Sequence, residues 1–209
     1  MGKVVCDLAI SVDGFVAGPE QSLENPLGIG GQAVHRWHVE AREHNEPEAS
    51  ALTAADAFIM GRNMYGPERG PWSTHSDDEA AGDWTGWWGP KPPYEAPVYV
   101  LTHFPREPVQ MQGGTTFHFV TDGIASALRQ ATAAAGTGDV AIAGGASTVN
   151  QYLRAGLLDE LRLHIAPVLL GTGERLFTDV GDLDLQPISS RTTDLATHVT
   201  YRLPRSTQR

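Results

Sequence analysis

The sequence has a single cysteine, Cys6, so no disulfide can form within its 209 residues. It also lacks a long apolar run, because the stretch from Val4 to Ile10 is too short to cross a membrane and contains Asp7. No basic segment followed by a long apolar core and a cleavage site, the pattern of a secretory signal, is present. These absences predict a cytoplasmic protein with no membrane partner, in which Cys6 is a buried strand residue rather than a catalytic thiol.

Positive charge is scarce as well. The chain has 15 Lys and Arg against 25 Asp and Glu, a formal net charge of −10. Such a surface repels nucleic-acid backbones, so nucleic acid is not an expected partner. A local pocket of backbone N–H groups with one or two cations can still bind an anionic ligand. With 41% apolar and 19% charged residues, the composition indicates one globular domain over residues 1–209.

Short β-rich runs alternate with segments of helical composition along the chain. Strands are predicted at 4–10, 57–60, 98–101, 117–120, 140–143, 159–167, 183–188 and 195–203, and helices at 33–45, 48–55, 123–135 and 147–155. Strands separated by helices indicate βαβ units. The pattern therefore predicts a three-layer α/β fold with a mostly parallel central sheet and antiparallel C-terminal strands.

Residues 66–97 differ in composition from the rest of the chain. They contain four of the five tryptophans and six prolines. Four indoles are costly to leave in water, so this insertion is expected to be structured. Covering the mouth of a pocket and packing on a second subunit are both open interpretations.

Three predicted strand ends carry groups that suit an anion. One strand runs through a Gly-Gly turn into a helix at residues 144–148, and Arg62 and Thr102 each follow another strand. Carboxyl ends of parallel strands meet at one sheet edge, where open α/β sheets bind ligands. Together they predict a phosphate site. Taken singly, the glycines can simply form a turn, Arg62 can make a surface ion pair and Thr102 can cap its loop. The G-x-G-x-x-G fingerprint of dinucleotide-binding domains is absent after the first strand.

Five motifs follow one another along the chain, at residues 9–17, 59–65, 100–103, 143–161 (Ala143 to Ser147, then Leu153, Leu157 and Asp159 to Leu161) and 165–171. Their order and spacing resemble those of the dihydrofolate reductase superfamily. In particular, the chain looks like the branch related to the C-terminal reductase domain of bacterial riboflavin-biosynthesis proteins, the RibD C-terminal domain. The resemblance covers most of the chain, up to about Phe177.

This resemblance implies NADPH binding and hydride transfer to a small pterin-like or pyrimidine-like heterocycle. The implied activity is similar to that of dihydrofolate reductase or 5-amino-6-(5-phosphoribosylamino)uracil reductase, in a homodimer. Ala9 and Val16 would border the nicotinamide, Arg62, Thr102 and His103 the adenosine 2′-phosphate, and residues 144–148 the pyrophosphate. The full implied cofactor set is Ala9, Val16, Gly61, Arg62, Leu101, Thr102, His103, Gly144, Gly145, Ala146, Ser147 and Thr148.

The catalytic residues are less well defined, because the chain departs from the family pattern. Met64 stands where dihydrofolate reductases commonly have Thr, and the proton-relay carboxylate of the first helix is missing. The candidates for acid–base work are His164, Asp13 and Glu40. Asp13 can also serve only to organise its Asp-Gly turn. His38 is a further candidate. No metal is expected, since His35, His38 and Glu40 do not share one helical face.

Two other classes of function remain open at this point. One is a nucleotide-binding sensor that keeps the cofactor pocket without turnover, which the missing carboxylate favours. The other is an oxidoreductase that uses a flavin or deazaflavin in the same pocket, which the tryptophan-rich insertion could cover.

Overall fold

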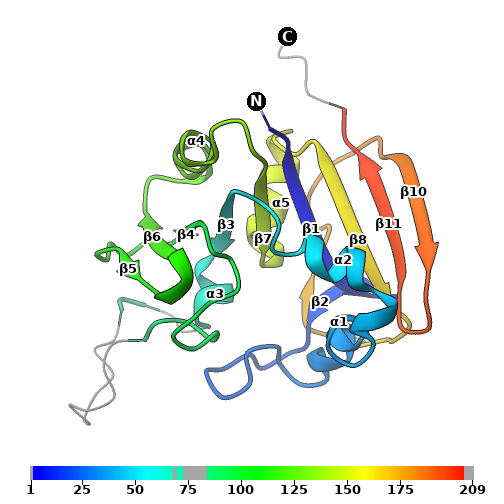
Figure 1. The fold of residues 1–209 in the computed structure, drawn as a ribbon. Coiled ribbons are helices and arrows are strands. Elements are labelled where there is room, and N and C mark those ends of the chain that lie inside the picture. The colour runs from blue at the N-terminus through cyan, green and yellow to red at the C-terminus, as the bar shows by residue number, and fades with distance from the viewer. Residues whose placement is uncertain (1, 68–69, 73–83, 205–209) are drawn as a thin grey trace.

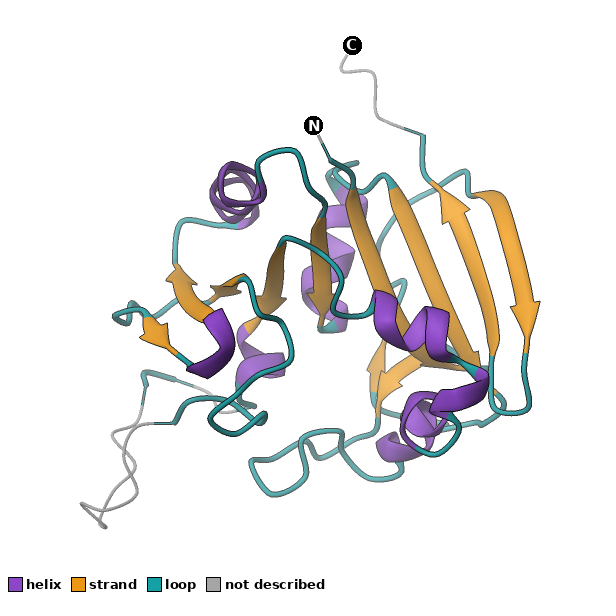
Figure 2. Cartoon of the chain, viewed as in Figure 1, coloured by secondary structure: helices purple, strands orange, loops and turns teal. Residues whose placement is uncertain are grey.

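The computed structural model describes residues 2–67, 70–72 and 84–204, which form a large sheet flanked by helices (Figures 1 and 2). The sheet has the strand order β10-β11-β8-β1-β7-β3-β4-β6-β5. Its strands are β1 (Val4–Ser11), β3 (Ala57–Gly61), β4 (Pro97–Leu101), β5 (Val109–Gln110), β6 (Thr116–Val120), β7 (Val140–Gly144), β8 (Glu160–Ala166), β10 (Gln186–Thr192) and β11 (Thr197–Arg202). A separate small sheet pairs β2 (Phe15–Ala17) with β9 (Glu174–Arg175).

The centre of the large sheet is parallel. β1 pairs in parallel with β7 and β8, and β3 pairs in parallel with β4 and β7. The C-terminal strands β10 and β11 are antiparallel and extend the sheet beyond β8. The predicted α/β fold with a mostly parallel sheet and antiparallel closing strands is therefore confirmed.

Two helices cover one face of the sheet. Cys6, Leu8 and Ile10 alternate along β1 and pack in one buried cluster with residues of α4 (Ile124–Ala135) and α5 (Ala146–Arg154). Successive side chains of a strand point to opposite faces of the sheet, so these three residues share one face and the intervening residues lie on the other. In Figure 1, α5 lies behind the sheet.

The opposite face is covered in two parts. The 3-10 helix η1 (Gly31–His35), α1 (Arg36–Val39) and α2 (Glu46–Ala51) lie over β1 and β8, where Trp37 is fully buried. Over β3 and β4 the cover comes from the tryptophan-rich insertion, whose Trp72, Trp84 and Trp88 pack against Phe58 and its neighbours. The insertion thus forms part of the core of this domain.

Some predicted boundaries are wrong. The helix expected at 33–45 is broken into η1, α1 and the 3-10 helix η2 (Arg42–His44). Asn45 explains the break, because its amide donates hydrogen bonds to the carbonyls of Trp37 and Ala41, which a continuous helix would bond to backbone N–H groups. The strand expected at 183–188 runs instead over β10, and the short strands β2, β5 and β9 were not predicted.

The structure shows the lengths of the helices and the position of the single cysteine. In the described part of the chain, every helix is too short or too polar to cross a membrane. Cys6 is fully buried in β1, and burial raises the pKa of its thiol well above the ordinary value. The interpretation of Cys6 as a strand residue is confirmed.

Candidate functional site

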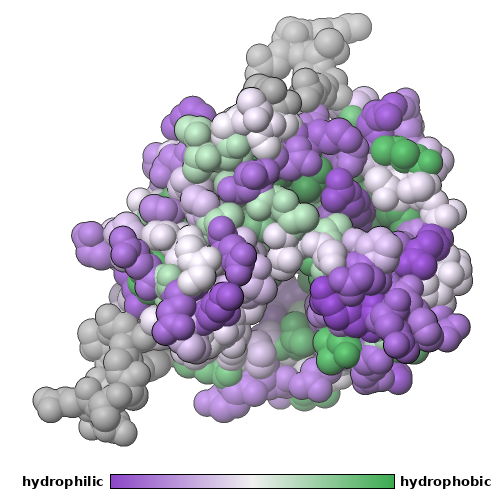
Figure 3. All heavy atoms as spheres, viewed as in Figure 1, coloured by the Kyte–Doolittle hydropathy of each residue, from purple (hydrophilic) through white to green (hydrophobic). Residues whose placement is uncertain are grey.

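A cavity of about 760 Å³ lies at the carboxyl ends of the parallel strands. This volume is within the range of small-molecule sites. Figure 3 shows the surface hollowed in the lower centre of the view, below the sheet of Figure 1. The cavity is lined from the ends of β1, β3, β4, β6 and β7, and all twelve residues of the implied cofactor set are among the lining. The structure therefore brings the three predicted strand ends together.

The Gly-Gly turn leads from β7 into the first turn of α5. Gly145 is the N-cap residue, and its carbonyl accepts hydrogen bonds from the backbone N–H groups of Thr148 and Val149. Among the described residues, no side chain caps this helix. The backbone N–H groups of Ala146 and Ser147 belong to the first helical turn, whose donors have no partner within a helix. They carry the positive end of the helix dipole at the cavity.

Close packing keeps this turn beside β3 while leaving open space in front of it. A Cβ atom at Gly61 would lie 2.4 Å from Thr148 Oγ1, so only glycine lets β3 approach α5 this closely. A Cβ atom at Gly145, by contrast, would meet no atom within 4 Å. The space beside Gly145 is therefore a cradle that a side chain would fill.

Arg62 is held in place at the mouth of the cavity by the insertion. Its Nη1 donates a 2.6 Å hydrogen bond to the carbonyl oxygen of Gly70, and its guanidinium lies 3.7 Å from the ring centroid of Trp72. Stacking on an indole restricts the planar guanidinium to one orientation. Trp87 and Trp88 also line the cavity. The interpretation of the insertion as a cover for the pocket mouth is supported by these contacts, while packing on a second subunit stays a prediction.

The third strand end combines a fixed hydroxyl with an exposed imidazole. Thr102 is buried, and its Oγ1 accepts a 3.2 Å hydrogen bond from the backbone N–H of Phe104. His103 is exposed beside it. Thr102 thus organises the loop after β4, and both residues line the cavity.

The other end of the cavity is built by β1, β2 and the segment after β2. Ala9 of β1 and Val16 of β2 lie there among apolar neighbours. Cavity-lining residues that sequence reasoning did not assign to a cofactor or substrate include Gln21, Leu27, His35, Asn63, Trp87, Trp88, Thr121 and Gln151. The end of β6 at Thr121 could have been found from the parallel strand order alone. Glu174 of β9 also lines the cavity.

The catalytic candidates lie outside the cavity lining. Asp13 accepts hydrogen bonds from the hydroxyl of Ser11 and from the backbone N–H groups of Leu170 and Gly171. These bonds lower the pKa of its carboxyl to about 2, and they match the alternative that Asp13 organises its turn. Glu40 is exposed and pairs with Arg36 at 2.8 Å. Neither geometry brings a carboxylate to the cavity.

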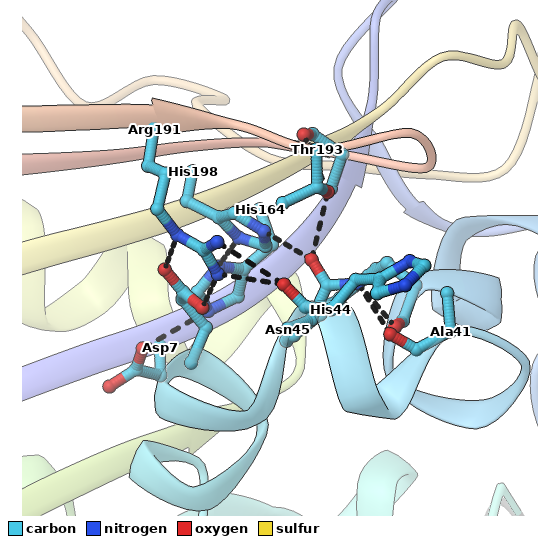
Figure 4. Close-up of polar contacts among 11 residues, drawn as sticks. Asp7, Ala41, His44, Asn45, His164, Arg191, Thr193 and His198 are labelled. Atoms are coloured by element: carbon cyan, nitrogen blue, oxygen red, sulfur yellow. Dashed lines mark hydrogen bonds and ion pairs between the residues drawn. The ribbon is translucent and has the colours of Figure 1, made fainter.

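His164 belongs to a buried polar network on the side of the sheet under α1 and α2 (Figure 4). Its Nε2 lies 3.2 Å from Asp7 Oδ1, and its Nδ1 lies 2.8 Å from Nδ1 of His198. Nε2 of His198 in turn contacts Asn45 Oδ1 at 2.8 Å, and the indole of Trp37 packs on the His164 ring. His164, through His198, therefore links β1, β8 and β11 to Asn45 beside η2, and this geometry places His164 outside the cavity lining.

We expect the free energy of unfolding to decrease as the pH falls from 6.5 towards 4. Burial, and then the neighbouring His164, lower the pKa of His198 to about 4, although Glu48 opposes the shift. The unfolded chain takes up a proton in this window before the folded chain does, so acid destabilises the fold. The loss is on the order of 2 kcal/mol for one such imidazole. Urea unfolding at pH 7, 5.5 and 4.5 measures it, and an unchanged pH slope in His198→Gln would assign the effect elsewhere.

Comparison with known proteins gives a family and a fold. The family model of the RibD C-terminal domain matches residues 2–199. The protein YyaP of Bacillus subtilis (strain 168), itself uncharacterized, is 25% identical over 198 residues, which are 91% of this chain and 88% of YyaP. The residues matched by the family model include every strand end that lines the cavity.

Solved structures show the same architecture. A protein from Shewanella sp. PV-4 named for riboflavin biosynthesis aligns with a TM-score of 0.65 and 23% identity, over 98% of this chain and 100% of that one. The dihydrofolate reductase of Enterococcus faecalis, complexed with NADP(H), aligns with a TM-score of 0.54 and 16% identity, over 97% and 96%. These likenesses show a dihydrofolate-reductase-like fold, and the match to the family model shows that this chain belongs to the RibD C-terminal domain family.

Proposed function

We propose that this protein is an NADPH-dependent reductase of a small heterocyclic compound. The observation that carries the proposal is the convergence of the Gly-Gly turn, Arg62 and Thr102 on one cavity. Membership of the RibD C-terminal domain family, together with structural neighbours named as reductases, supports the same reaction class. So does the fold shared with an enzyme that was complexed with NADP(H).

The residues of the cavity fit a phosphorylated dinucleotide. The open space at Gly145 and the first N–H groups of α5 suit a pyrophosphate, which needs close backbone approach and a favourable dipole. Arg62 is oriented by Gly70 and Trp72 before any ligand arrives, which suits a second, terminal phosphate. NADPH would supply the hydride. The chain would hold the phosphates and present Ala9 and Val16 as an apolar wall to the nicotinamide.

Titration with NADPH, NADH and FMN tests the cofactor. Trp87 and Trp88 line the cavity, so a bound dinucleotide should quench their fluorescence. We expect NADPH to bind at least about tenfold more tightly than NADH, since the 2′-phosphate adds a charged contact. Tighter binding of FMN than of NADPH would favour the flavin alternative and contradict the proposal.

Turnover separates an enzyme from a sensor. NADPH oxidation is followed with pterins and pyrimidine ribosyl compounds as acceptors. A protein that binds NADPH tightly yet oxidises it with none of them would match the sensor alternative. The homodimer implied by the resemblance stays part of the proposal, and light scattering measures it.

A further inference from the structure

The part of the cavity beside β1 and β2 is mostly apolar, and it is called the β1–β2 end below. Ala9 and Val16, which would also border the nicotinamide, lie here with Ala17 of β2 and with Pro26 and Leu27 of the following segment. Walls of this kind fit the faces of a flat ring, with a few polar groups to set its orientation. The polar groups at this end therefore decide which ring is bound.

Three polar side chains line this end: Gln21, Glu174 and His35. The amide of Gln21 is already bonded on both sides, since its Nε2 donates to the carbonyl of Pro26 and its Oε1 accepts from Asn63. Glu174 is an exposed carboxylate on β9. A ligand at this end consequently meets one anionic group and one imidazole.

Cations are missing from this end in the part of the chain that the structure describes. Arg62 is the one Lys or Arg in the described cavity lining; it follows β3, two strands from β1, and its guanidinium is held on Gly70 and Trp72. The arginines of the neighbouring elements are engaged elsewhere. Arg36 pairs with Glu40, Arg42 pairs with Glu46, and Arg175 donates to the carbonyl of Asp13. A phosphate here would face Glu174 without a countercharge, in a chain of net charge −10.

His35 is suited to an uncharged partner. It is the last residue of η1, and its Nδ1 lies 3.2 Å from Nε2 of His38. Its Nε2 is buried and has no hydrogen-bond partner among the described residues. Burial, and then His38, lower the pKa of His35 to about 4, so the imidazole is neutral at pH 7. A neutral imidazole with an unpartnered nitrogen gains a hydrogen bond when a ligand supplies one.

We propose that this end of the cavity binds an uncharged or cationic heterocycle that carries no phosphate group, with His35 as its direct polar contact. The inference rests on the reductase function proposed above and narrows its substrate class. It separates this protein from a phosphoribosyl-uracil reductase, the activity implied by the resemblance in sequence.

Matched pairs of ligands test the substrate class. The protein is saturated with NADP⁺ and titrated calorimetrically with 6-hydroxymethylpterin and its phosphate ester, and with uridine and uridine 5′-monophosphate. We expect at least one unphosphorylated probe to bind, and to bind about tenfold or more tightly than its phosphorylated partner. Equal or tighter binding of the phosphorylated partners, or no binding of either unphosphorylated probe to the NADP⁺ complex, overturns the inference. Failure of NADP⁺ itself to bind contradicts the proposed function instead.

His35→Phe tests the polar contact, because it keeps a planar ring and removes both nitrogens. We expect the affinity for the unphosphorylated probe to fall about 5- to 20-fold, since the probe loses one hydrogen bond and keeps a polar group unpaired. The affinity for NADP⁺ and the Tm should change little. His44→Phe is the matched control, because His44 is exposed on η2 outside the cavity lining. Unchanged probe affinity, or an equal loss of probe and NADP⁺ affinity, shows that His35 is not the contact.

Discussion

Gly145→Val is expected to reduce NADPH affinity about 100-fold or more while the chain stays folded. The wild-type position has open space where a Cβ would lie, and its φ of −71° is accessible to any residue. The added side chain would occupy the cradle beside the first N–H groups of α5. Loss of two charge-assisted hydrogen bonds of about 1.5–3 kcal/mol each accounts for the magnitude.

Fluorescence titration with NADPH measures this loss, and circular dichroism with the Tm verifies the fold. Gly145→Ala should give an intermediate affinity because it adds a single methyl group. Ala133→Val is the control, since it adds apolar volume at an exposed position of α4 outside the cavity lining. Wild-type affinity in a folded Gly145→Val protein would show that the cradle does not hold the pyrophosphate.

Arg62→Ala is expected to weaken NADPH about 10- to 100-fold and NADH by much less. The guanidinium is proposed to bind the 2′-phosphate, which NADH lacks, and a charged hydrogen-bonded contact of this kind is worth about 1.5–3 kcal/mol. Both dinucleotides are titrated into the same preparation, so that the fraction of protein able to bind is the same in both measurements. Equal losses for the two would count against the assigned role.

Arg62 also supports the insertion, so a control must separate the two roles. Arg106 lies over the same Trp72 ring at 5.2 Å and is outside the cavity lining. Arg106→Ala therefore removes a cation from that indole without removing a cavity group. We expect this variant to keep the preference for NADPH over NADH, and loss of the preference there would assign it to the insertion rather than to Arg62.

The strand ends of the proposed cofactor site could be predicted because their signals are local. Each strand is read from a few consecutive apolar residues, and Gly145, Arg62 and Thr102 follow such runs directly. Parallel strands have their carboxyl ends at one edge, so residues in these positions must converge whatever the details of packing. Only the strand order and the family resemblance were needed to expect one cavity.

The position of the catalytic candidates outside the cavity lining could not be predicted, for the opposite reason. Asp13, Glu40 and His164 are chemically suitable, yet whether such a side chain faces a cavity depends on which neighbours pack beside it. His164 lies in β8, within the strand predicted for it, but Asp7 and His198 from the two flanking strands contact both of its ring nitrogens. Asp7 and His198 are 157 and 34 residues away from His164 in the sequence, so no local pattern indicates these contacts.

The sequence by itself determined the central strands, the edge where their carboxyl ends meet and which groups at that edge are candidates for anion binding, because strand periodicity and glycine turns act between near neighbours in the chain. The tertiary structure alone decided which residues form the β1–β2 end of the cavity. His35, Gln21 and Glu174 meet there from segments with little periodicity, and the burial that keeps His35 neutral arises only when η1 packs on the sheet. Charge and hydrogen-bonding state are set by this packing, which no local pattern of residues encodes.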